Sequence, residues 1–222
     1  LEMKAAIHHY QQILGLDLVE IMPDGRVYLR ADDEFDRHSV ILREAGAAGM
    51  DVMGFKVSSE SDIERFARAF NDRGIHVEYI AAGEQPGVGQ RIRFATPSGH
   101  FFDLYAHMDL SGSGPITENP TVWRVPPRGL KILRFDHCLL YGPDIEQTAE
   151  LFREVLEFNV TEVLEDSEKG VKIAIFLTCS NKAHDIALVN HPEKGKFHHC
   201  SFLLEDWSDI GNAADILTHY NV

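Results

Sequence analysis

Apolar residues recur along the chain with spacings that predict both helices and strands. In segment 61–73 they recur every three or four residues, as on one face of an α-helix, and similar patterns predict helices over 1–14, 145–156 and about 206–218. Short apolar runs bounded by Gly, Pro, Asn or Asp predict strands. These strands are expected over 17–22, 26–30, 38–43, 52–57, 75–80, 90–95, 101–106, 132–141, 159–164, 172–178, 185–189 and 197–204.

The same order of elements, one strand, one helix and three strands, recurs along the chain. The segment His38-Ser39-Val40-Ile41-Leu42 matches His184-Asp185-Ile186-Ala187-Leu188, and residues 55–63 match residues 202–210. Such self-similarity indicates duplicated structural units. We therefore predict an α+β fold of repeated βαβββ modules, with two modules in each of two curved-sheet, barrel-like domains.

The repeat also predicts where the domains lie. We expect an N-terminal domain over 1–110, a Gly-, Pro- and Ser-rich linker over 111–130, and a C-terminal domain over 131–222. Complete modules would need one more strand before Leu1 and three more strands after Val222. We therefore expect the chain to be a fragment that is cut at both ends.

The overall charge and composition exclude some classes of partner. The chain has 222 residues, and its formal net charge of −14 leaves no basic face to neutralise the phosphates of a nucleic acid. No apolar run approaches the roughly 20 residues of a membrane span, so we expect no membrane partner. The three cysteines lack the spacing of a metal site. We expect them to be reduced thiols in a cytoplasmic protein.

Two histidines at repeat-related positions predict a metal site in the second half. His137 and His199 lie near the starts of the first strands of successive modules, so module pairing would bring them together. Two imidazoles and one carboxylate are the ligands of non-haem Fe(II) enzymes. In the first half, Asp103 marks the position expected for the carboxylate, whose second-half equivalent would lie beyond Val222. Because Val52 replaces the second histidine there, we expect the metal in the second half only.

Neighbouring residues have more than one interpretation. Cys138 and Cys200 each follow a proposed ligand, but alternation along a strand turns them to the other face, so we expect packed thiols and no zinc site. Phe176 and Leu139 fit either an ordinary core or the wall of a substrate cup. Each strand histidine could likewise be a hydrogen-bonded core or surface residue.

Longer motifs in both halves carry a family resemblance. They are Pro97-Ser98-Gly99-His100, Arg134-Phe135-Asp136-His137, Lys182-Ala183-His184-Asp185, His191-Pro192-Glu193-Lys194-Gly195 and Phe197-His198-His199-Cys200-Ser201-Phe202. These motifs resemble the catechol 2,3-dioxygenases (metapyrocatechases), which are type I extradiol dioxygenases of the vicinal oxygen chelate superfamily.

The resemblance implies a function and a set of site residues. The expected reaction converts catechol and O2 to 2-hydroxymuconic semialdehyde in a homotetramer, with Fe(II) in the C-terminal domain. His137 and His199 match the ligand histidines, and His184 matches the histidine of acid–base catalysis. The ligand glutamate of the family would belong to the segment beyond residue 222. Apart from the resemblance, our own expectation is that Phe176 and Leu139 form the wall that faces the catechol ring.

Two other functions stay open from the residues alone. A glyoxalase-type isomerase of the same superfamily would be expected to take metal ligands from both halves, which Val52 opposes. A non-catalytic binding module would keep the paired-module fold without the chemistry. The joint presence of His137, His184 and His199 opposes this second alternative.

Overall fold

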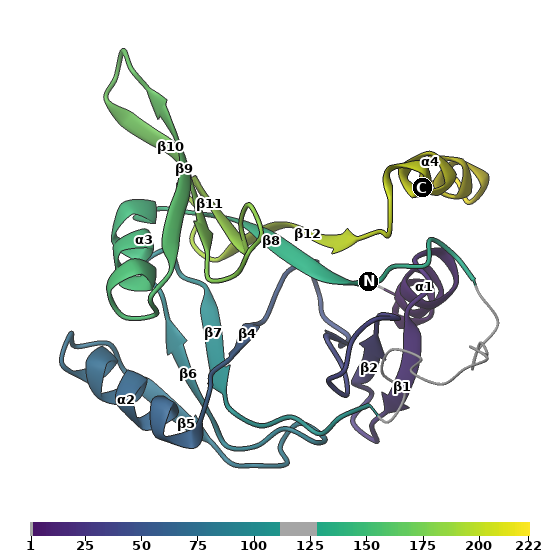
Figure 1. The fold of residues 1–222 in the computed structure, drawn as a ribbon, viewed down its shortest axis with the longest axis horizontal. Coiled ribbons are helices and arrows are strands. Elements are labelled where there is room, and N and C mark those ends of the chain that lie inside the picture. The colour runs from purple at the N-terminus through teal and green to yellow at the C-terminus, as the bar shows by residue number, and fades with distance from the viewer. Residues whose placement is uncertain (1, 112–127) are drawn as a thin grey trace. The chain divides into compact units, whose positions relative to one another are not determined.

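The computed structural model describes residues 2–111 and 128–222. Most of the predicted linker over 111–130 therefore lies outside the described residues. Figure 1 shows the order of the elements along the chain. The helical segments are α1 (Met3–His8), η1 (His9–Ile13), α2 (Glu60–Asn71), α3 (Ile145–Glu154) and α4 (Trp207–His219). The strands are β1 (Asp17–Ile21), β2 (Val27–Arg30), β3 (Val40–Leu42), β4 (Met53–Lys56), β5 (Val77–Ile80), β6 (Arg91–Ala95), β7 (Phe101–Tyr105), β8 (Arg134–Gly142), β9 (Asn159–Asp166), β10 (Val171–Thr178), β11 (Ile186–Asn190) and β12 (Lys196–Leu203).

This order confirms the predicted α+β fold of repeated βαβββ modules. Two modules are complete, one from β4 to β7 and one from β8 to β11. The predicted helix over 1–14 is divided, because a π-helical turn follows α1: the N–H of Leu14 donates to the carbonyl of His9, five residues earlier. Among the described residues, no helix is both long and apolar enough to span a membrane.

The chain groups into two compact units. Unit 1 comprises Leu1–Ala48, Asp109–Asp136 and Ser201–Val222, and unit 2 comprises Gly49–Met108 and His137–Cys200. Strands β8 and β12 contribute residues to both. The predicted domains, 1–110 and 131–222, were defined by the order of modules along the sequence and not by contacts. The two compact units do not test these boundaries, which stay a prediction.

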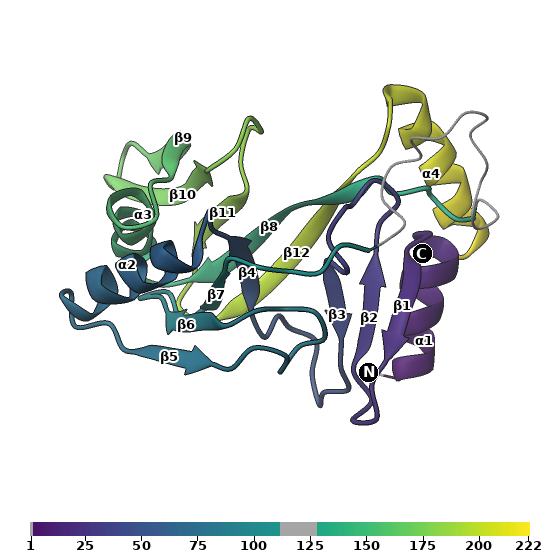
Figure 2. The same cartoon turned by 60° about the horizontal axis from the view of Figure 1, so that its bottom comes forward.

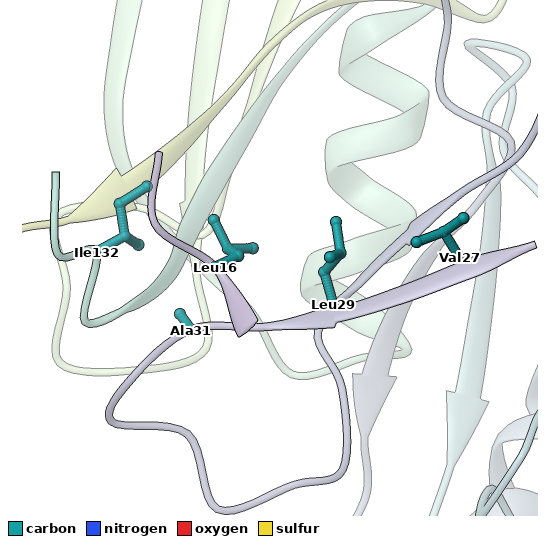
Figure 3. Packing of buried hydrophobic residues seen from close by; sticks show 5 residues of the cluster. All are labelled: Leu16, Val27, Leu29, Ala31 and Ile132. Carbon is teal, nitrogen blue, oxygen red and sulfur yellow. The ribbon is translucent and has the colours of Figure 1, made fainter. Parts of the chain in front are cut away.

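Unit 1 contains a three-stranded antiparallel sheet in the order β1-β2-β3. Its buried cluster is small and apolar (Figure 3), and consists of Leu16, Val27, Leu29, Ala31 and Ile132. Partly buried residues, among them Met3, Ile7 and Tyr10, cover this cluster. The apolar side chains of the predicted first helix therefore serve as one wall of a core.

Unit 2 contains a four-stranded sheet in the order β4-β7-β6-β5 and most of a five-stranded sheet in the order β12-β8-β11-β10-β9. Helix α2 forms where the spacing of apolar residues predicts a helix, and its cap and its packing explain why. The Ser59 side chain caps it by accepting a hydrogen bond from the backbone N–H of Asp62. Its apolar face is buried, and Phe70 stacks on Phe94 of β6 with ring centroids 4.1 Å apart.

Strand β8 lies next to β12 on one side and pairs in parallel with β11 on the other (Figure 2). A parallel pair needs a crossover between its strands, and α3 with β9 and β10 supplies it. This topology places the strand of His137 between the strand of His199 and the strand that follows His184.

Candidate active site

The three predicted histidines come from three neighbouring segments of the five-stranded sheet, all within unit 2. His137 lies on β8, His199 lies on β12, and His184 lies in the turn that leads from β10 into β11. The ring centroids of His137 and His184 are 4.2 Å apart, and those of His137 and His199 are 5.7 Å apart. The fold thus brings together three imidazoles that are far apart in the sequence.

The separation of His137 and His199 fits a shared metal ion. An imidazole nitrogen binds such an ion at about 2.1 Å, which places each ring centroid about 3 Å from it and allows two centroids to lie up to about 6 Å apart. The observed 5.7 Å, with the ring planes at 72°, is within this limit. The distance between the two rings therefore allows His137 and His199 to bind the same ion, as the predicted ligand pair requires.

The surroundings of His199 favour the form of imidazole that binds metals. Burial lowers the pKa of His199, and electrostatic interaction with the neighbouring His198 and His137 side chains acts in the same direction. A lowered pKa keeps the ring neutral at neutral pH. The Nδ1 atoms of His199 and His198 are 2.6 Å apart, so His198 occupies one ring nitrogen of His199 and leaves Nε2 for a ligand bond.

His184 is held by the turn in which it lies. The next residue, Asp185, is 6% exposed, and its carboxylate accepts hydrogen bonds from the Thr178 hydroxyl and the Cys179 backbone N–H, both at 2.9 Å. It also forms an ion pair of 2.7 Å with Lys182. Burial by itself raises the pKa of Asp185, but these hydrogen bonds, with that of Lys182 the strongest, lower it below its ordinary value. Sequence reasoning missed this anchor, and its only signal was an acidic residue directly after the histidine.

The register of the sheet places Phe176 and Leu139 in one row beside the histidines. Phe176 of β10 pairs with Ala187 of β11, and Ala187 pairs with Leu139 of β8. Leu139 is two residues from His137 on the same strand, so both side chains point to one face. The Phe176 ring lies 5.1 Å from the His184 ring, centroid to centroid. The two half-buried apolar side chains therefore flank the histidine cluster.

The first half has a different arrangement at the position expected for the carboxylate ligand. Asp103 is 3% exposed, and both of its oxygens accept hydrogen bonds from guanidinium groups, those of Arg91 at 2.8 Å and Arg93 at 2.7 Å. The Asp103 interaction raises the pKa of Arg93. In this half, two arginine side chains neutralise the carboxylate.

A third ligand for His137 and His199 is not found among residues 2–111 and 128–222, where no group of three His, Cys, Asp or Glu residues is arranged to hold a metal. The cysteines next to the two histidines take no part in a disulfide. Burial raises the pKa of the Cys138 thiol to about 12, so this side chain stays protonated and packs as an apolar group.

Comparisons with known proteins identify relatives of both halves. Residues 50–109 match the family described as "Catechol 2,3-dioxygenase-like N-terminal domain". Residues 134–222 match the "Glyoxalase/Bleomycin resistance protein/Dioxygenase superfamily". The structure of the 2,3-dioxygenase LapB from Pseudomonas sp. KL28 superposes with a TM-score of 0.94 at 42% sequence identity, and the match covers 100% of this chain and 77% of that chain. Homoprotocatechuate 2,3-dioxygenase from Arthrobacter globiformis has the same fold, with a TM-score of 0.82 at 22% identity over 99% of this chain and 65% of that one.

Two proteins of known name are similar to this chain in amino-acid sequence. The manganese-dependent 2,3-dihydroxybiphenyl 1,2-dioxygenase of Geobacillus genomosp. 3 is 25% identical over 99% of this chain and 70% of that protein. The metapyrocatechase of Pseudomonas sp. (strain CF600) is 47% identical over 219 residues, which are 98% of this chain and 71% of that protein. The family resemblance expected from the motifs is confirmed: the chain belongs to the metapyrocatechase, or catechol 2,3-dioxygenase, family of extradiol dioxygenase enzymes.

Proposed function

We propose that the second half of the chain carries the reaction centre for extradiol cleavage of catechol by O2, with 2-hydroxymuconic semialdehyde as the product. In this proposal His137 and His199 are metal ligands, and His184 is the acid–base residue. The observation that carries it is the convergence of the three imidazoles in a chain that is 47% identical to a metapyrocatechase.

The metal of this proposal is Fe(II). Two imidazoles and a carboxylate on one face of the ion are typical of Fe(II) oxygenases. The same donor atoms also suit manganese, and the Geobacillus relative is named as manganese-dependent. When bound, the ion would hold the catechol oxygens and O2 and would activate them for reaction with each other. The third ligand is expected to be a carboxylate, and we assign no described residue to it.

His184 is suited to move the catechol protons. An imidazole has one ring nitrogen that can accept a proton and another that can donate one, so the His184 side chain can accept a proton from a catechol hydroxyl and later return it. Its ring is 4.2 Å from that of His137, centroid to centroid, so a substrate beside the proposed ligand is within reach. The anchored turn from Thr178 to Asp185 limits the movement of this ring. The ring therefore stays oriented for proton transfer to and from the substrate.

Phe176 and Leu139 would form the apolar wall for the catechol ring. They lie in one row with Ala187 across three strands and flank the histidines. Aromatic and aliphatic side chains bind the flat apolar body of a catechol and exclude water, while the two hydroxyls face the imidazoles.

The expected homotetramer and the cytoplasmic location also belong to this proposal. The homotetramer rests on the family resemblance alone. The cytoplasmic location rests on the number and spacing of the three cysteines, which are not typical of the disulfide framework of a secreted protein.

The proposal is tested by loading the full-length protein with Fe(II) under anaerobic conditions and adding catechol and O2. We expect a yellow ring-fission product and consumption of one O2 per catechol. Binding of catechol to the iron-loaded protein without product would support the alternative of a non-catalytic binding module. Parallel loading with Mn(II) determines which ion supports turnover.

A further inference from the structure

A tight turn in the first half, between β6 and β7, is buried. The turn comprises Thr96, Pro97, Ser98, Gly99 and His100, and it is closed by a hydrogen bond of 2.9 Å from the N–H of Thr96 to the carbonyl of His100. Ser98 is fully buried and His100 is 3% exposed. Turns normally lie on the surface, so a buried one must be covered by another part of the protein. Here the covering segments come from the second half of the chain, within the same unit 2.

One side of this turn contacts the strand of His137. A Cβ atom added to Gly142, the last residue of β8, would lie 2.6 Å from the Ser98 carbonyl oxygen, so only glycine permits this approach. The N–H of Ser98 donates a hydrogen bond of 3.0 Å to the hydroxyl of Thr148 in α3. Thr148 is fully buried, so water cannot replace it as the acceptor.

The other side of the turn contacts the start of β12. The N–H of Gly195 donates to the Ser98 carbonyl at 2.9 Å, and His100 Nε2 lies 3.2 Å from the carbonyl oxygen of Lys196. A Cβ atom on Gly99 would lie 2.9 Å from the nitrogen of Gly195. Lys196 is the first residue of β12 and lies three residues before His199. The turn therefore holds the entry to the second ligand-bearing strand.

The hydrogen bonds of His100 specify one tautomer of its neutral ring. The carbonyl of Lys196 can only accept, so Nε2 must carry the proton, and Nδ1 then accepts from the Ser98 hydroxyl 3.0 Å away. Burial lowers the pKa of His100, although the bond to Lys196 acts in the opposite direction, so the ring is neutral at neutral pH. A neutral ring with both nitrogens bonded is a rigid link between segments 96 residues apart.

We propose that the turn from Thr96 to His100 is a positioning element that sets the separation of β8 and β12, and hence that of His137 and His199, with His100 as its key residue. The inference rests on the proposed function, because it takes His137 and His199 as the two metal ligands. Under this proposal the first half of the chain, which carries no proposed ligand, takes part in the metal site by holding both ligand strands.

The test compares two variants of His100. His100→Phe keeps a ring in the site but cannot donate to Lys196. His100→Gln places an amide N–H at nearly the distance of Nε2 and can restore that bond. The matched control is Phe70→Leu, which weakens the core of the first half at the contact with Phe94 and leaves the turn untouched. Thr148→Val, which removes the acceptor for Ser98, serves as a milder variant if His100→Phe does not fold.

The first readout is the dissociation constant for Fe(II), measured anaerobically by competition with a chromogenic chelator. The second is hydrogen exchange of the β12 amides in the metal-free protein. We expect His100→Phe, or Thr148→Val in its place, to raise the dissociation constant about tenfold or more and to speed exchange in β12. We expect His100→Gln to recover most of both. Phe70→Leu should lower the melting temperature while affinity and β12 exchange stay at their wild-type values.

Two outcomes would overturn the inference, and they are distinguishable. Unchanged Fe(II) affinity and β12 exchange in His100→Phe, with a lower melting temperature only, would show that the turn serves general stability. If His199→Ala bound Fe(II) as tightly as the wild type, the ligand assignment would be wrong. The proposed function would then fail together with the positioning role.

Discussion

Asp185 and Lys182 form an ion pair of 2.7 Å that closes the turn containing His184. The Asp185 carboxylate also accepts hydrogen bonds from Thr178 and Cys179. A buried carboxylate with several donors fixes the segment around it more firmly than exposed ion pairs do. Because His184 lies outside the strands, this turn helps to hold its ring beside His137.

The first prediction concerns this anchor. Asp185→Asn removes the charge and turns one acceptor atom into a donor that faces the same donors, so the turn should loosen and His184 should move. We expect kcat to fall about 10- to 100-fold, the usual cost of a misplacement of about 1 Å, with metal content unchanged.

The matched control for this variant is Asp166→Asn. Asp166 closes the turn between β9 and β10 in the same way, with bonds from the backbone of Glu168 and Lys169 and an ion pair of 3.1 Å to Lys169. Its change should leave kcat unaltered. Equal kcat values for Asp185→Asn and the wild type would show that the anchor does not act through His184.

The second prediction concerns the thiol next to this anchor. Partial desolvation of the thiol and the negative charge of Asp185 raise the pKa of Cys179 to about 11. At pH 8 its thiolate fraction is therefore about two orders of magnitude below that of an ordinary cysteine. We expect iodoacetamide to modify Cys179 slowly at pH 8 and faster as the pH rises toward 11, although the residue is exposed.

The measurement is the rate of Cys179 modification followed by peptide mass spectrometry. Unfolded protein gives the reference rate, and Asp185→Asn should bring the native rate closer to it. Modification of native Cys179 at the unfolded rate would show that the carboxylate does not control this thiol.

Much of the fold follows from local patterns in the sequence. The apolar spacing of Ile63, Phe66 and Phe70 predicts α2, and the alternating runs predict the strands to within one or two residues in most cases. The π-helical turn after α1 was not predictable, because the apolar spacing of residues 1–14 predicts one ordinary α-helix and gives no sign of the change at His9. Local preference therefore specifies the elements and packing adjusts their ends.

Some residues of the candidate site were likewise predictable from the sequence, and others were not. The positions of His137 and His199 are predictable because they follow from the module repeat. Sequence reasoning named no partner for His100, since its partner Lys196 becomes a neighbour only when the two halves pack together. The two arginines around Asp103 were also missed, because charged residues in a strand usually indicate a solvent-facing side. The features of the site that the sequence did not predict are therefore mostly contacts between segments that are far apart in the chain.

The third prediction tests the ligand assignment. His199→Ala should abolish the retention of Fe(II) through gel filtration, because one imidazole of the pair is lost and the other cannot hold the ion with the same affinity. His76→Ala, which changes an exposed histidine outside the cluster, should retain iron as the wild type does. Iron content per chain is measured by atomic emission. Stoichiometric iron in His199→Ala would exclude this residue as a ligand.

The fourth prediction separates acid–base chemistry from metal binding. His184→Ala should keep its iron but turn over catechol about 10²–10⁴-fold more slowly, which is the usual contribution of a positioned acid–base group. Stopped-flow measurement of ring fission in the iron-loaded variant gives this rate. Normal turnover would remove the role assigned to His184, and loss of iron would show that it is a ligand.

The fifth prediction concerns the apolar wall. Phe176 packs against His184 with ring centroids 5.1 Å apart and shares a row with Leu139, so its ring is placed to contact a bound catechol. Phe176→Ala should raise the KM for catechol about tenfold, since about 1–3 kcal/mol of apolar contact is lost, while iron content stays at the wild-type value. The matched control is Ile173→Ala, which shortens an exposed apolar side chain on the same strand and should leave KM unchanged. Because Phe176 also supports the His184 ring, kcat is measured together with KM. A fall in kcat with constant KM would mean that Phe176 positions His184 and does not contact the substrate.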